Sequence, residues 1–393
     1  MHVRRFQLTG FRNYRSLDLE LPAGPLLFLG DNAQGKSNLL EAVGLLATGK
    51  SVRAGQDAEM IGWEVEEGMQ PFTRVHGVVE RRQGAVDLEA IVAGPVPPPA
   101  PPNRGGKRFR VNGIARRAVD FVGQLRAVLF TADDLDIVSG PPANRRAFLD
   151  TALGQADRGY YAAQQRYGRI LQQRNATLRR IKEGIAGLDE LSLWDDSFSR
   201  EGAVIVAARH RAVRRLGDLA AESHVRLSGS ALELLELAYQ PQLGESFRDG
   251  RELLPEDATA ASVQPLFAAV LAAQRRRETA AGLSLVGPHR DDVAIVLNGV
   301  AAASFGSRAQ IRTAALSMRL AEAELLRGGD ADAPVLLLDD ILSEMDEKRR
   351  DAVLGGLAGF DQVWITATAG SALPVGFLGV ATAYRVEAGA VSR

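Results

Sequence analysis

Apolar and polar residues alternate along the first third of the chain, and a period of two residues predicts half-buried β-strands. Residues 3–8 and 11–21 are expected to form two strands around a turn. Pro22 and Gly24 end this pair, and the apolar run 26–29 predicts a buried strand after them. Four later runs are expected to form one antiparallel sheet: 75–81, 86–92, 109–111 and 127–130.

Residues 94–106 interrupt these runs with proline and glycine. Proline lacks a backbone N–H, so the segment can form neither a strand ladder nor a helix. Two interpretations are open: a partner-binding polyproline motif, or the long tip of a hairpin. We favour the hairpin tip, because such tips tolerate insertions.

From residue 143 to about residue 230 the spacing becomes helical. Apolar residues at steps of three, four and seven predict a coiled-coil seam, and a break at 187–189 separates two stretches. An antiparallel arm of ~30 residues per strand would be ~45 Å long, at about 1.5 Å per residue. The seam residues are Tyr167, Leu171, Leu178, Ile181, Ile185 and Leu188, with Phe198, Ile205, Ala208, Leu216 and Leu219 in the second stretch.

Nine arginines of this arm are expected on its outer, solvated surface: Arg166, Arg169, Arg174, Arg179, Arg180, Arg209, Arg211, Arg214 and Arg215. Residues 258–281 predict a further amphipathic helix that ends in three arginines.

The composition is that of an ordinary soluble protein, with 46% hydrophobic and 24% charged residues in a chain of 393. There is no cysteine, which excludes disulfides, zinc–thiolate sites and thiol nucleophiles. Every apolar stretch is shorter than the ~18–20 residues that span a bilayer. The basic N-terminus lacks the apolar core of a signal peptide. We therefore expect a cytoplasmic protein with no membrane partner.

The net charge is −1, so any surface that binds nucleic acid must be local. Lysine occurs at only five positions, and 42 of the 47 basic residues are arginine. This bias weakens the meaning of any one arginine cluster. The basic cluster after the proline-rich segment either contacts a phosphate backbone or solvates a sheet face. It contains Arg104, Lys107, Arg108, Arg110, Arg116 and Arg117.

The run 26–29 leads into G-x-x-x-x-G-K-S at 30–37 and then into a helical-looking segment. Glycine at 30 and 35 lets consecutive N–H groups curl around phosphate oxygens. Lys36 would contact the terminal phosphates, and the Ser37 hydroxyl would bind Mg²⁺. A strand before the loop and a helix after it are the context that this motif requires. The predicted nucleotide-binding residues are Gly30, Asp31, Asn32, Ala33, Gln34, Gly35, Lys36, Ser37 and Asn38.

A second motif lies near the other end of the chain, where the apolar run 335–338 ends in Asp339 and Asp340. A buried parallel strand that delivers acids at its carboxyl end fits the magnesium side of a P-loop site. Asp339 is expected to hold Mg²⁺ through water, and Asp340 to orient or deprotonate the attacking water. About 300 residues separate the two motifs, so both chain ends would build the nucleotide fold around an inserted helical lobe. The absence of an N-K-x-D motif argues against a GTPase.

Ser307 is a good N-cap for a helix whose apolar spacing continues to the Gly-Gly pair at 328–329. A helix N-terminus with exposed N–H groups and a serine hydroxyl can bind an anion, although most capped helices bind none.

These segments carry a family resemblance. Residues 306–310 resemble the signature of ABC-type ATPases, and 343–346 resemble the D-loop. The whole set resembles RecF, a family of SMC-like bacterial DNA repair ATPases, and its motifs run in that family's order from residue 11 to residue 368. Four further segments contribute to the resemblance, the last two of them specific to RecF: 11–14, 133–136, 144–150 and 287–292.

The chain departs from the family pattern at three positions. Ala132-Asp133 stands where Pro-Glu or Pro-Asp is usual, Ala309 replaces a glycine of the signature, and Met345 replaces a leucine. The switch histidine of ABC transporters is absent. Thr366 takes its place, as in RecF proteins, so a fast transporter-like ATPase cycle is not expected.

The resemblance implies the fold class: an α/β, ABC-type P-loop ATPase head, with a mixed sheet and helices, and an inserted helical lobe that bears a short antiparallel coiled-coil arm. Residues 1–140 and 285–393 would form the ATPase lobe, and 141–284 the inserted lobe. The signature segment, 304–312, would lie at the junction of the two lobes.

The resemblance also implies the activity. RecF-like proteins form an ATP-dependent homodimer in which each signature serine caps the γ-phosphate held by the other subunit. The closed dimer grips double-stranded DNA near single-strand/duplex junctions. With RecO and RecR it aids RecA loading, replication restart and the SOS response. A weak, DNA-stimulated ATPase that uses ATP and Mg²⁺ is therefore expected, in the cytoplasm and associated with the nucleoid when bound to DNA.

The resemblance assigns roles to further residues. It adds Arg12 and Asn13 to the nucleotide site and makes Thr366 the switch residue. The signature residues that would contact the partner's γ-phosphate, and the D-loop residues, are Ser307, Arg308, Ala309 and Gln310, with Ser343 and Asp346. The candidate DNA contacts are Lys107, Arg108, Arg110, Arg116, Arg179 and Arg180.

Three other classes of protein are alternatives. A transporter subunit would need a membrane partner and usually a switch histidine. An SMC-type tether would need a far longer coiled coil than this arm. The sequence does not exclude a third class, a protein that binds ATP structurally without hydrolysing it.

Overall fold

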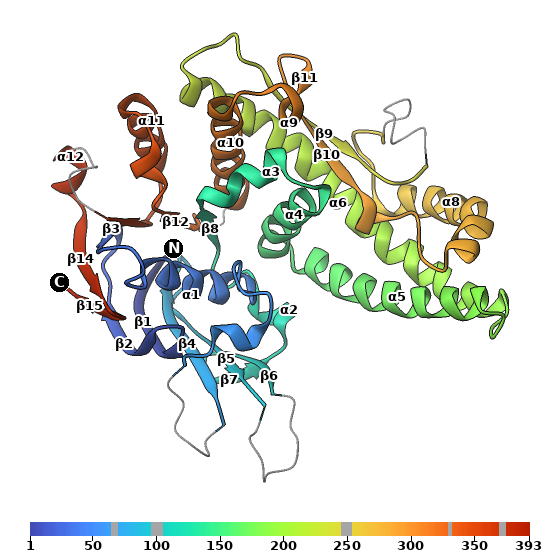
Figure 1. Ribbon diagram of the computed structural model, residues 1–393, viewed down its shortest axis with the longest axis horizontal. Helices are drawn as coiled ribbons and strands as arrows, with labels where there is room; N and C mark the ends of the chain where they lie inside the picture. The colour runs from blue at the N-terminus through green and yellow to red at the C-terminus, as the bar shows by residue number, and fades with distance from the viewer. Residues whose placement is uncertain (64–69, 96–104, 245–253, 329–331, 369–374) are drawn as a thin grey trace. The chain divides into compact units, whose positions relative to one another are not determined.

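The computed structural model describes residues 1–63, 70–95, 105–244, 254–328, 332–368 and 375–393 (Figure 1). The described chain forms two compact units. Unit 1 contains residues 1–134, 226–228 and 319–393, and unit 2 contains residues 135–225 and 229–318.

This division differs from the predicted lobes mainly over residues 285–318, which we expected with the chain ends and which belong to unit 2; residues 135–140 also belong to unit 2, and residues 226–228 belong to unit 1. The reason is strand pairing. β10 (Asp292–Leu297) pairs antiparallel with β9 (Leu235–Gln240), so the later strand is hydrogen-bonded into the inserted part of the chain.

The first sheet of unit 1 is antiparallel and has the order β2-β1-β4-β5-β6-β7. The strand predictions for 3–8, 11–21, 75–81, 86–92 and 109–111 are confirmed in this sheet. β5 and β6 form a hairpin around the proline-rich segment, of which residues 96–104, Arg104 included, lie outside the described residues. The bounds are β1 (His2–Phe11), β2 (Tyr14–Glu20), β4 (Phe72–Glu80), β5 (Val86–Ala93), β6 (Gly106–Val111) and β7 (Ile114–Arg116).

The second sheet of unit 1 has the order β15-β14-β3-β13-β12-β8, and every pair is parallel except β14 with the edge strand β15. The prediction for 127–130 is wrong, because this run joins the parallel sheet beside β12. Its four residues are all apolar, as is usual for a strand buried on both faces. The bounds are β3 (Gly24–Leu29), β8 (Ala127–Phe130), β12 (Val335–Asp339), β13 (Gln362–Ala367), β14 (Thr382–Glu387) and β15 (Ala390–Ser392).

One apolar core joins the two sheets with helix α1 (Lys36–Thr48). Neighbouring strands stack Tyr384, Phe28 and Trp364, with ring centroids 5.3 and 5.0 Å apart. The fully buried Gln362 side chain links the sheets, since it exchanges hydrogen bonds of 2.9 and 3.0 Å with the Val3 backbone. Both chain ends therefore contribute to one rigid platform.

Unit 2 is mainly helical and has a three-stranded sheet, β11-β10-β9, with β11 at Val300–Ala301. Helices α5 (Arg158–Lys182), α6 (Asp189–Ser228) and α8 (Ala260–Ala281) share one apolar core. The predicted helix at 258–281 is confirmed as α8. Among the described residues, unit 2 also contains α3 (Leu135–Ser139), α4 (Pro142–Ala156), α9 (Ala302–Phe305) and the start of α10 (Arg308–Arg327), which ends in unit 1. The helices α2 (Ala118–Phe121), α11 (Glu347–Leu357) and α12 (Val375–Leu378) belong to unit 1.

Two details of the predicted arm are wrong. Helix α5 ends at Lys182, before Gly184 at φ +74°, and the seam residues Ile185 and Leu188 lie 65% and 52% exposed in the connection. Arg174 and Arg209, expected on the outer surface, are 0% and 3% exposed. The two arginines are buried because they have acidic partners within unit 2, which the periodicity of a single helix does not reveal.

Among the helices of the described residues, none is both long enough and apolar enough to cross a membrane.

Candidate active site

The P-loop and the paired aspartates lie at the same edge of the parallel sheet. β13 lies between β3, which leads into the loop, and β12, which ends in Asp339. Because parallel strands present their carboxyl ends at one edge, the order β3-β13-β12 brings together segments about 300 residues apart.

Ser37 and Asp339 are in direct contact. The Ser37 hydroxyl donates a hydrogen bond of 2.8 Å to Asp339 Oδ1. The neighbouring Lys36 ammonium is buried and donates to the carbonyl oxygens of Gly30 and Asp31, at 2.6 and 2.8 Å. The structure thus brings together the cation, the hydroxyl and the carboxylate that the sequence assigned to one site.

The residue pair fits Mg²⁺, a hard cation that prefers hydroxyl, carboxylate and phosphate oxygens together with water. Within the parts of the chain that the structure describes, no group of three or more histidine and acidic side chains could hold a metal by itself. Ser37 and Asp339 are therefore suited to a cation that nucleotide oxygens and water also coordinate.

Thr366 connects the two aspartates. Its hydroxyl donates to Asp339 Oδ1 at 2.9 Å and accepts from the Asp340 backbone N–H at 2.9 Å. Asp340 has φ +53°, a left-handed conformation that is uncommon for a residue with a side chain. Its Oδ1 is buried and has no hydrogen-bond partner among the described residues. A buried carboxylate oxygen without a partner is available to a ligand or to water.

The glycines of the loop are required by close approach. At Gly35, with φ +113°, a Cβ would lie 2.6 Å from Asn13 Nδ2, and at Gly30 it would lie 2.2 Å from the Val386 carbonyl oxygen. Asp31, Asn32 and Ala33 are exposed, and Ala33 is itself left-handed at φ +65°. The loop therefore turns exposed backbone toward solvent from a closely packed base.

Arg12 and Asn13 both lie at the loop but are already engaged. Asn13 donates to the Gln34 carbonyl at 3.0 Å and accepts from the Asn38 amide at 2.8 Å. Arg12 donates through Nε and Nη2 to the buried Glu41 carboxylate, at 3.1 and 2.7 Å. Sequence reasoning missed Glu41, an acid in the apolar run of α1 that could have indicated a buried partner for arginine.

The signature segment begins helix α10, as predicted. Ser307 and Gln310 form a reciprocal cap: Gln310 N donates to Ser307 Oγ at 3.3 Å, and Ser307 N donates to Gln310 Oε1 at 3.0 Å. Ser307, Arg308 and Ala309 are exposed. This helix N-terminus is open to a ligand or to a second molecule.

The D-loop residues close a turn after β12. The Ser343 hydroxyl donates to the Asp340 carbonyl at 2.7 Å. Asp346 caps helix α11, where the Arg349 backbone N–H donates to it at 2.9 Å and lowers the pKa of its carboxyl. Both residues are exposed, and their local role is to shape the turn that follows Asp340.

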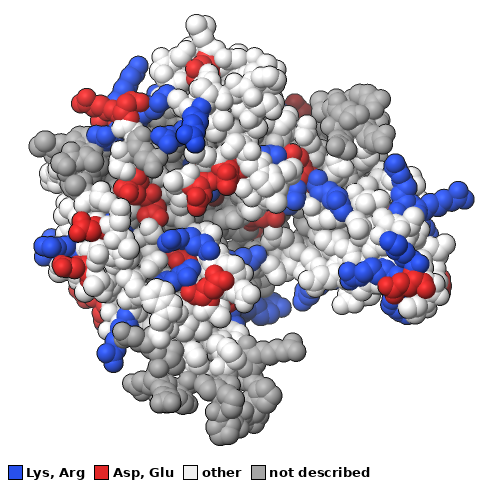
Figure 2. Space-filling model, in the orientation of Figure 1, with Lys and Arg blue, Asp and Glu red and all other residues white. Residues whose placement is uncertain are grey.

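The candidate DNA contacts do not form one cluster. Successive strand residues point to opposite faces, so Arg108 and Arg110 share one face of β6, while Lys107 and Arg116 share the other through the pair Phe109↔Arg116. Lys107 is paired with Asp57 at 2.6 Å. On the face shown in Figure 2, basic side chains gather over the end of unit 2 where α5 and α8 lie in Figure 1. That end of α5 carries the exposed Arg179, and Arg180 paired with Glu190 at 2.9 Å.

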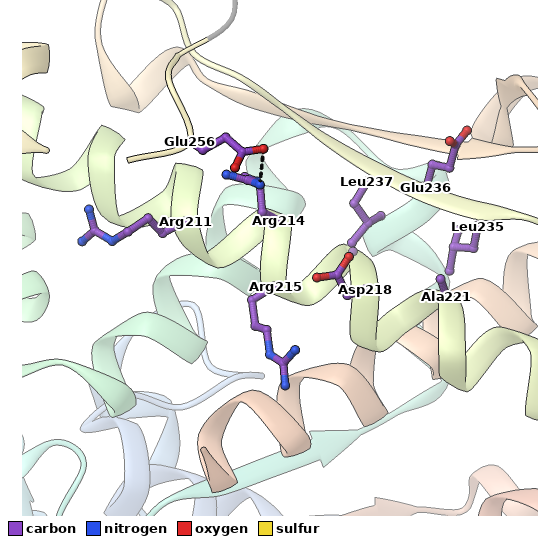
Figure 3. Close-up of a pocket in the computed structure, with 10 residues that line it drawn as sticks. Arg211, Arg214, Arg215, Asp218, Ala221, Leu235, Glu236, Leu237 and Glu256 are labelled. Carbon is purple, nitrogen blue, oxygen red and sulfur yellow. Dashed lines mark ion pairs between the residues drawn. The ribbon is translucent and has the colours of Figure 1, made fainter. Parts of the chain in front are cut away.

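Three more arginines of the predicted outer surface line a pocket of about 550 Å³ beside α6 (Figure 3). Arg214 pairs with Glu256 at 2.7 Å, and Arg211 donates to the Ala258 carbonyl at 3.1 Å. Asp218 and Glu236 also line the pocket, so its charge is mixed.

The two RecF-specific motifs interlock within unit 2. From residues 144–150, Arg145 binds Asp292 through two hydrogen bonds of 2.6 and 3.0 Å, and Arg146 donates to the Asp291 carbonyl at 2.8 Å. The buried Arg209 joins the motifs a third time, since it pairs with Asp150 at 2.7 Å and with Asp291 at 3.1 Å. These motif residues bind one another and hold the unit together.

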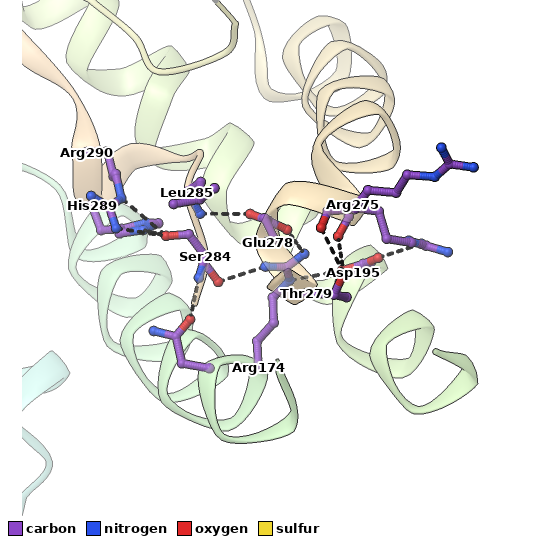
Figure 4. A network of polar contacts seen from close by, with 11 residues as sticks. Arg174, Asp195, Arg275, Glu278, Thr279, Ser284, Leu285, His289 and Arg290 are labelled. Carbon is purple, nitrogen blue, oxygen red and sulfur yellow. Dashed lines mark hydrogen bonds and ion pairs between the residues drawn. The ribbon is translucent and has the colours of Figure 1, made fainter. Parts of the chain in front are cut away.

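A second buried network supports the same segment (Figure 4). Arg174 donates to Asp195, Ser284 and the fully buried Glu278, at 2.9, 2.7 and 2.6 Å. His289 contacts the Tyr167 hydroxyl through Nδ1 at 2.7 Å and the Ser284 carbonyl through Nε2 at 3.2 Å. Burial lowers the pKa of His289 to about 4, so the ring is neutral at neutral pH.

Comparison with known proteins agrees with this geometry. A family model described as an AAA domain matches residues 5–84. The chain is 40% identical over 404 residues to the DNA replication and repair protein RecF of Herpetosiphon aurantiacus, covering 100% of this chain and 99% of that protein. It is 41% identical over 402 residues to RecF of Roseiflexus castenholzii, covering 99% of each.

Two solved structures are similar over the whole chain. One, the recombination mediator protein RecF-ATPrS in the RecFOR pathway, has a TM-score of 0.85 at 29% identity and covers 100% of this chain and 97% of that one. An Smc head domain from Pyrococcus furiosus has a TM-score of 0.53 at 13% identity and covers 100% of this chain and 95% of that one, which shows a common fold alone. The predicted fold class, an ABC-type P-loop ATPase head with a helical lobe, is confirmed. The chain belongs to the RecF family of DNA replication and repair proteins.

Proposed function

We propose that this protein is an ATP-dependent DNA-binding dimer of recombinational repair. It binds ATP with Mg²⁺ in unit 1, closes as a homodimer on double-stranded DNA near single-strand junctions, and resets by slow, DNA-stimulated hydrolysis. Acting in the cytoplasm with RecR and RecO, it aids RecA loading, replication restart and SOS induction.

One observation carries the nucleotide part of the proposal: the 2.8 Å hydrogen bond between Ser37 and Asp339. A structural loop would not need a hydroxyl and a carboxylate in contact beside a buried ammonium. When bound, Mg²⁺ neutralises charge on the terminal phosphates. The chain's own groups then have separate tasks. Lys36 contacts phosphate oxygens, and Asp340, with its unpartnered Oδ1, accepts the proton of the attacking water.

The signature segment supports dimerisation. Ser307, Arg308 and Ala309 are exposed at the start of α10, and a helix N-terminus with a hydroxyl favours an anion. A phosphate held by one subunit and capped by the other would make ATP part of the interface. ATP binding would then favour the closed dimer, and hydrolysis would release it.

The exposed arginines support DNA binding without base readout, because arginine contacts phosphate oxygens in any sequence. Affinity for duplex DNA is expected to fall about 10³-fold between about 50 mM and about 200 mM salt, as counterion release requires. Fluorescence anisotropy with a labelled duplex measures this. An affinity that does not change with salt would remove the phosphate-contact model.

Nucleotide binding is tested with Lys36→Ala. The variant loses a charge-assisted contact from a buried site, so the ATP dissociation constant is expected to rise about 100-fold or more. Lys182→Ala, an exposed lysine on α5, is the control and should bind ATP like the wild type. Isothermal titration calorimetry gives both constants. Wild-type affinity in Lys36→Ala would contradict the proposed site.

Dimerisation is tested by light scattering with ATP, ADP and duplex DNA. Ser307→Ala should keep ATP affinity and fail to dimerise with ATP. Ser304→Ala, an exposed serine three residues earlier, should dimerise normally. If Ser307→Ala forms the same ATP-dependent dimer as the wild type, the signature does not act across subunits.

A further inference from the structure

The turn of the C-terminal hairpin contacts the middle of the P-loop. Strands β14 and β15 are joined by Ala388 and Gly389. The Gly389 N–H donates to the Gln34 carbonyl at 3.1 Å, and the Ala388 N–H donates to Gln34 Oε1 at 2.7 Å. The Asn13 amide donates to the same Gln34 carbonyl at 3.0 Å. The backbone and the side chain of one loop residue are therefore held from outside the loop.

The hairpin also approaches the start of the loop. A Cβ on Gly30 would lie 2.2 Å from the Val386 carbonyl oxygen, and a Cβ on Gly389 would lie 2.2 Å from the Asn13 carbonyl oxygen. Neither position has room for a side chain. The hairpin is therefore closely fitted to the start of the loop at Val386 and to the turn between β1 and β2, which contains Asn13, at Gly389.

Packing does not hold the loop on this side. The loop borders a pocket of about 460 Å³ that Gly30, Asp31 and Gln34 line together with Tyr384, Arg385 and Val386 of β14. On this side of the loop, the hydrogen bonds of the turn add to those that Asn13 donates to Gln34 and that Lys36 donates to Asp31.

The turn keeps a backbone conformation that its sequence does not favour. Ala388 and Gly389 have φ of +48° and +77°, the signs of a type I′ turn, in which asparagine is usual at the first position. Two other hairpins of the chain follow that rule, with Asn112-Gly113 at +51° and +75° and Asn298-Gly299 at +50° and +80°. Of these three turns, the alanine turn is the one that contacts the P-loop. Ala388, whose backbone is strained, donates its N–H to Gln34.

We propose that the Ala388-Gly389 turn is a positioning element of the P-loop. By fixing the Gln34 peptide, it holds residues 31–35, of which 31–33 are exposed, in the curl that binds phosphate. The inference rests on the proposed nucleotide site for its functional consequence, whereas its structural part concerns the loop without nucleotide.

The chain provides a matched pair of variants. Gly389→Ala places a methyl group against the Asn13 carbonyl and displaces the turn. Gly113→Ala makes the same substitution at the same position of a similar turn in unit 1, where nothing lies within 4 Å of the new Cβ. Both variants carry similar backbone strain, so any difference between them reports the contacts of Gly389 with Gln34 of the loop and with Asn13.

Hydrogen exchange of the nucleotide-free protein tests the structural part. The protected amides at the two ends of the loop, Gly30, Asn38 and Leu39, which donate to the carbonyls of Ala367 and Gly35, are expected to exchange about tenfold faster or more in Gly389→Ala than in Gly113→Ala, because the loop opens when the turn no longer holds Gln34. Equal exchange in the two variants would overturn the proposal, whether or not the protein binds nucleotide.

Calorimetry with ATP and ADP tests the functional part. Gly389→Ala is expected to weaken both nucleotides alike, about tenfold, because the loop contacts phosphates that both contain, whereas Gly113→Ala should stay within about twofold of the wild type. Wild-type affinity in Gly389→Ala would refute the positioning role. If the wild type itself bound no nucleotide, the proposed function would fail, and the exchange experiment would still decide the structural claim.

Discussion

Lys36 and Asp340 at the nucleotide edge of unit 1 and the arginines of the motif cluster of unit 2 are held in opposite ways. In unit 2, Arg174 and Arg209 have acidic partners at 2.6 to 3.1 Å. At the nucleotide edge, Lys36 donates only to carbonyls of its own loop, within the described contacts, and Asp340 Oδ1 has no partner in the described chain. A buried charge matched by an opposite charge stabilises the fold, whereas a charge without one is available to a ligand.

Backbone strain follows the same division. Among the described non-glycine residues with positive φ, Arg12, Ala33, Asp340 and Ala388 lie at or against the nucleotide edge, whereas the other two are asparagines of hairpin turns, Asn112 and Asn298, a residue type that tolerates this conformation. Strained residues persist where the surroundings determine them, and they concentrate at functional sites. The contrast also explains the motifs: residues 144–150 and 287–292 identify the family because they hold unit 2 together, although nothing in their geometry is catalytic.

The largest effect is expected from removing one partner of the buried ion pairs in unit 2. Arg174→Met leaves Glu278 buried and unpaired, which should lower the free energy of unfolding by about 3–5 kcal/mol. Urea unfolding followed by circular dichroism measures the change. Arg169→Met, an exposed position on the same helix, should change it by less than about 0.5 kcal/mol. If the two variants were equally stable, the buried network would not be structural.

The carboxylate without a hydrogen-bond partner at Oδ1 is tested with Asp340→Asn. Asparagine tolerates the left-handed backbone, and Oδ1 has no bond to lose, so stability should stay within about 0.5 kcal/mol of the wild type. Single-turnover ATP hydrolysis should fall about 100-fold or more, the typical contribution of a general base. The control is Asp351→Asn, an exposed aspartate of α11. A fall in stability with unchanged hydrolysis would mean that Asp340 has a structural role and not a catalytic one.

A smaller effect is expected on the pH dependence of stability, through His289 in unit 2. Burial lowers the pKa of His289 to about 4, below its ordinary value of 6.5, so the unfolded chain binds the proton first as pH falls. The stability from neutral His289 is complete above pH 6.5 and is lost between about pH 6.5 and pH 4. At pH 5 the loss should be about 2 kcal/mol relative to pH 7.5.

His289→Gln removes this titration and provides the control, because the other acidic groups are common to both proteins. The measurement is the difference between the two urea unfolding free energies at pH 7.5 and at pH 5. A difference that is independent of pH would mean that the folded protein lets His289 ionise freely, and that the cluster is less closed than its contacts indicate.

The local chemistry of the site can be predicted from short segments of the sequence. The glycine loop between a strand and a helix, the apolar strand that ends in Asp339 and the cap formed by Ser307 each depend on a few consecutive residues. Their conformations follow from backbone sterics, capping and a short period of apolar residues. The order of the family motifs was sufficient for the fold class.

Which distant groups meet could not be predicted from such segments, because it depends on the tertiary structure. The sheet order brings Ser37 to Asp339, assigns β8 to the parallel sheet and lets the Ala388-Gly389 turn contact Gln34. Arg174 is buried because α8 covers that side of α5 with Glu278, although the spacing within α5 predicts a solvated residue. Periodicity describes one element at a time. Burial and hydrogen bonding depend on the second element that packs against it, and that partner is chosen by long-range contacts.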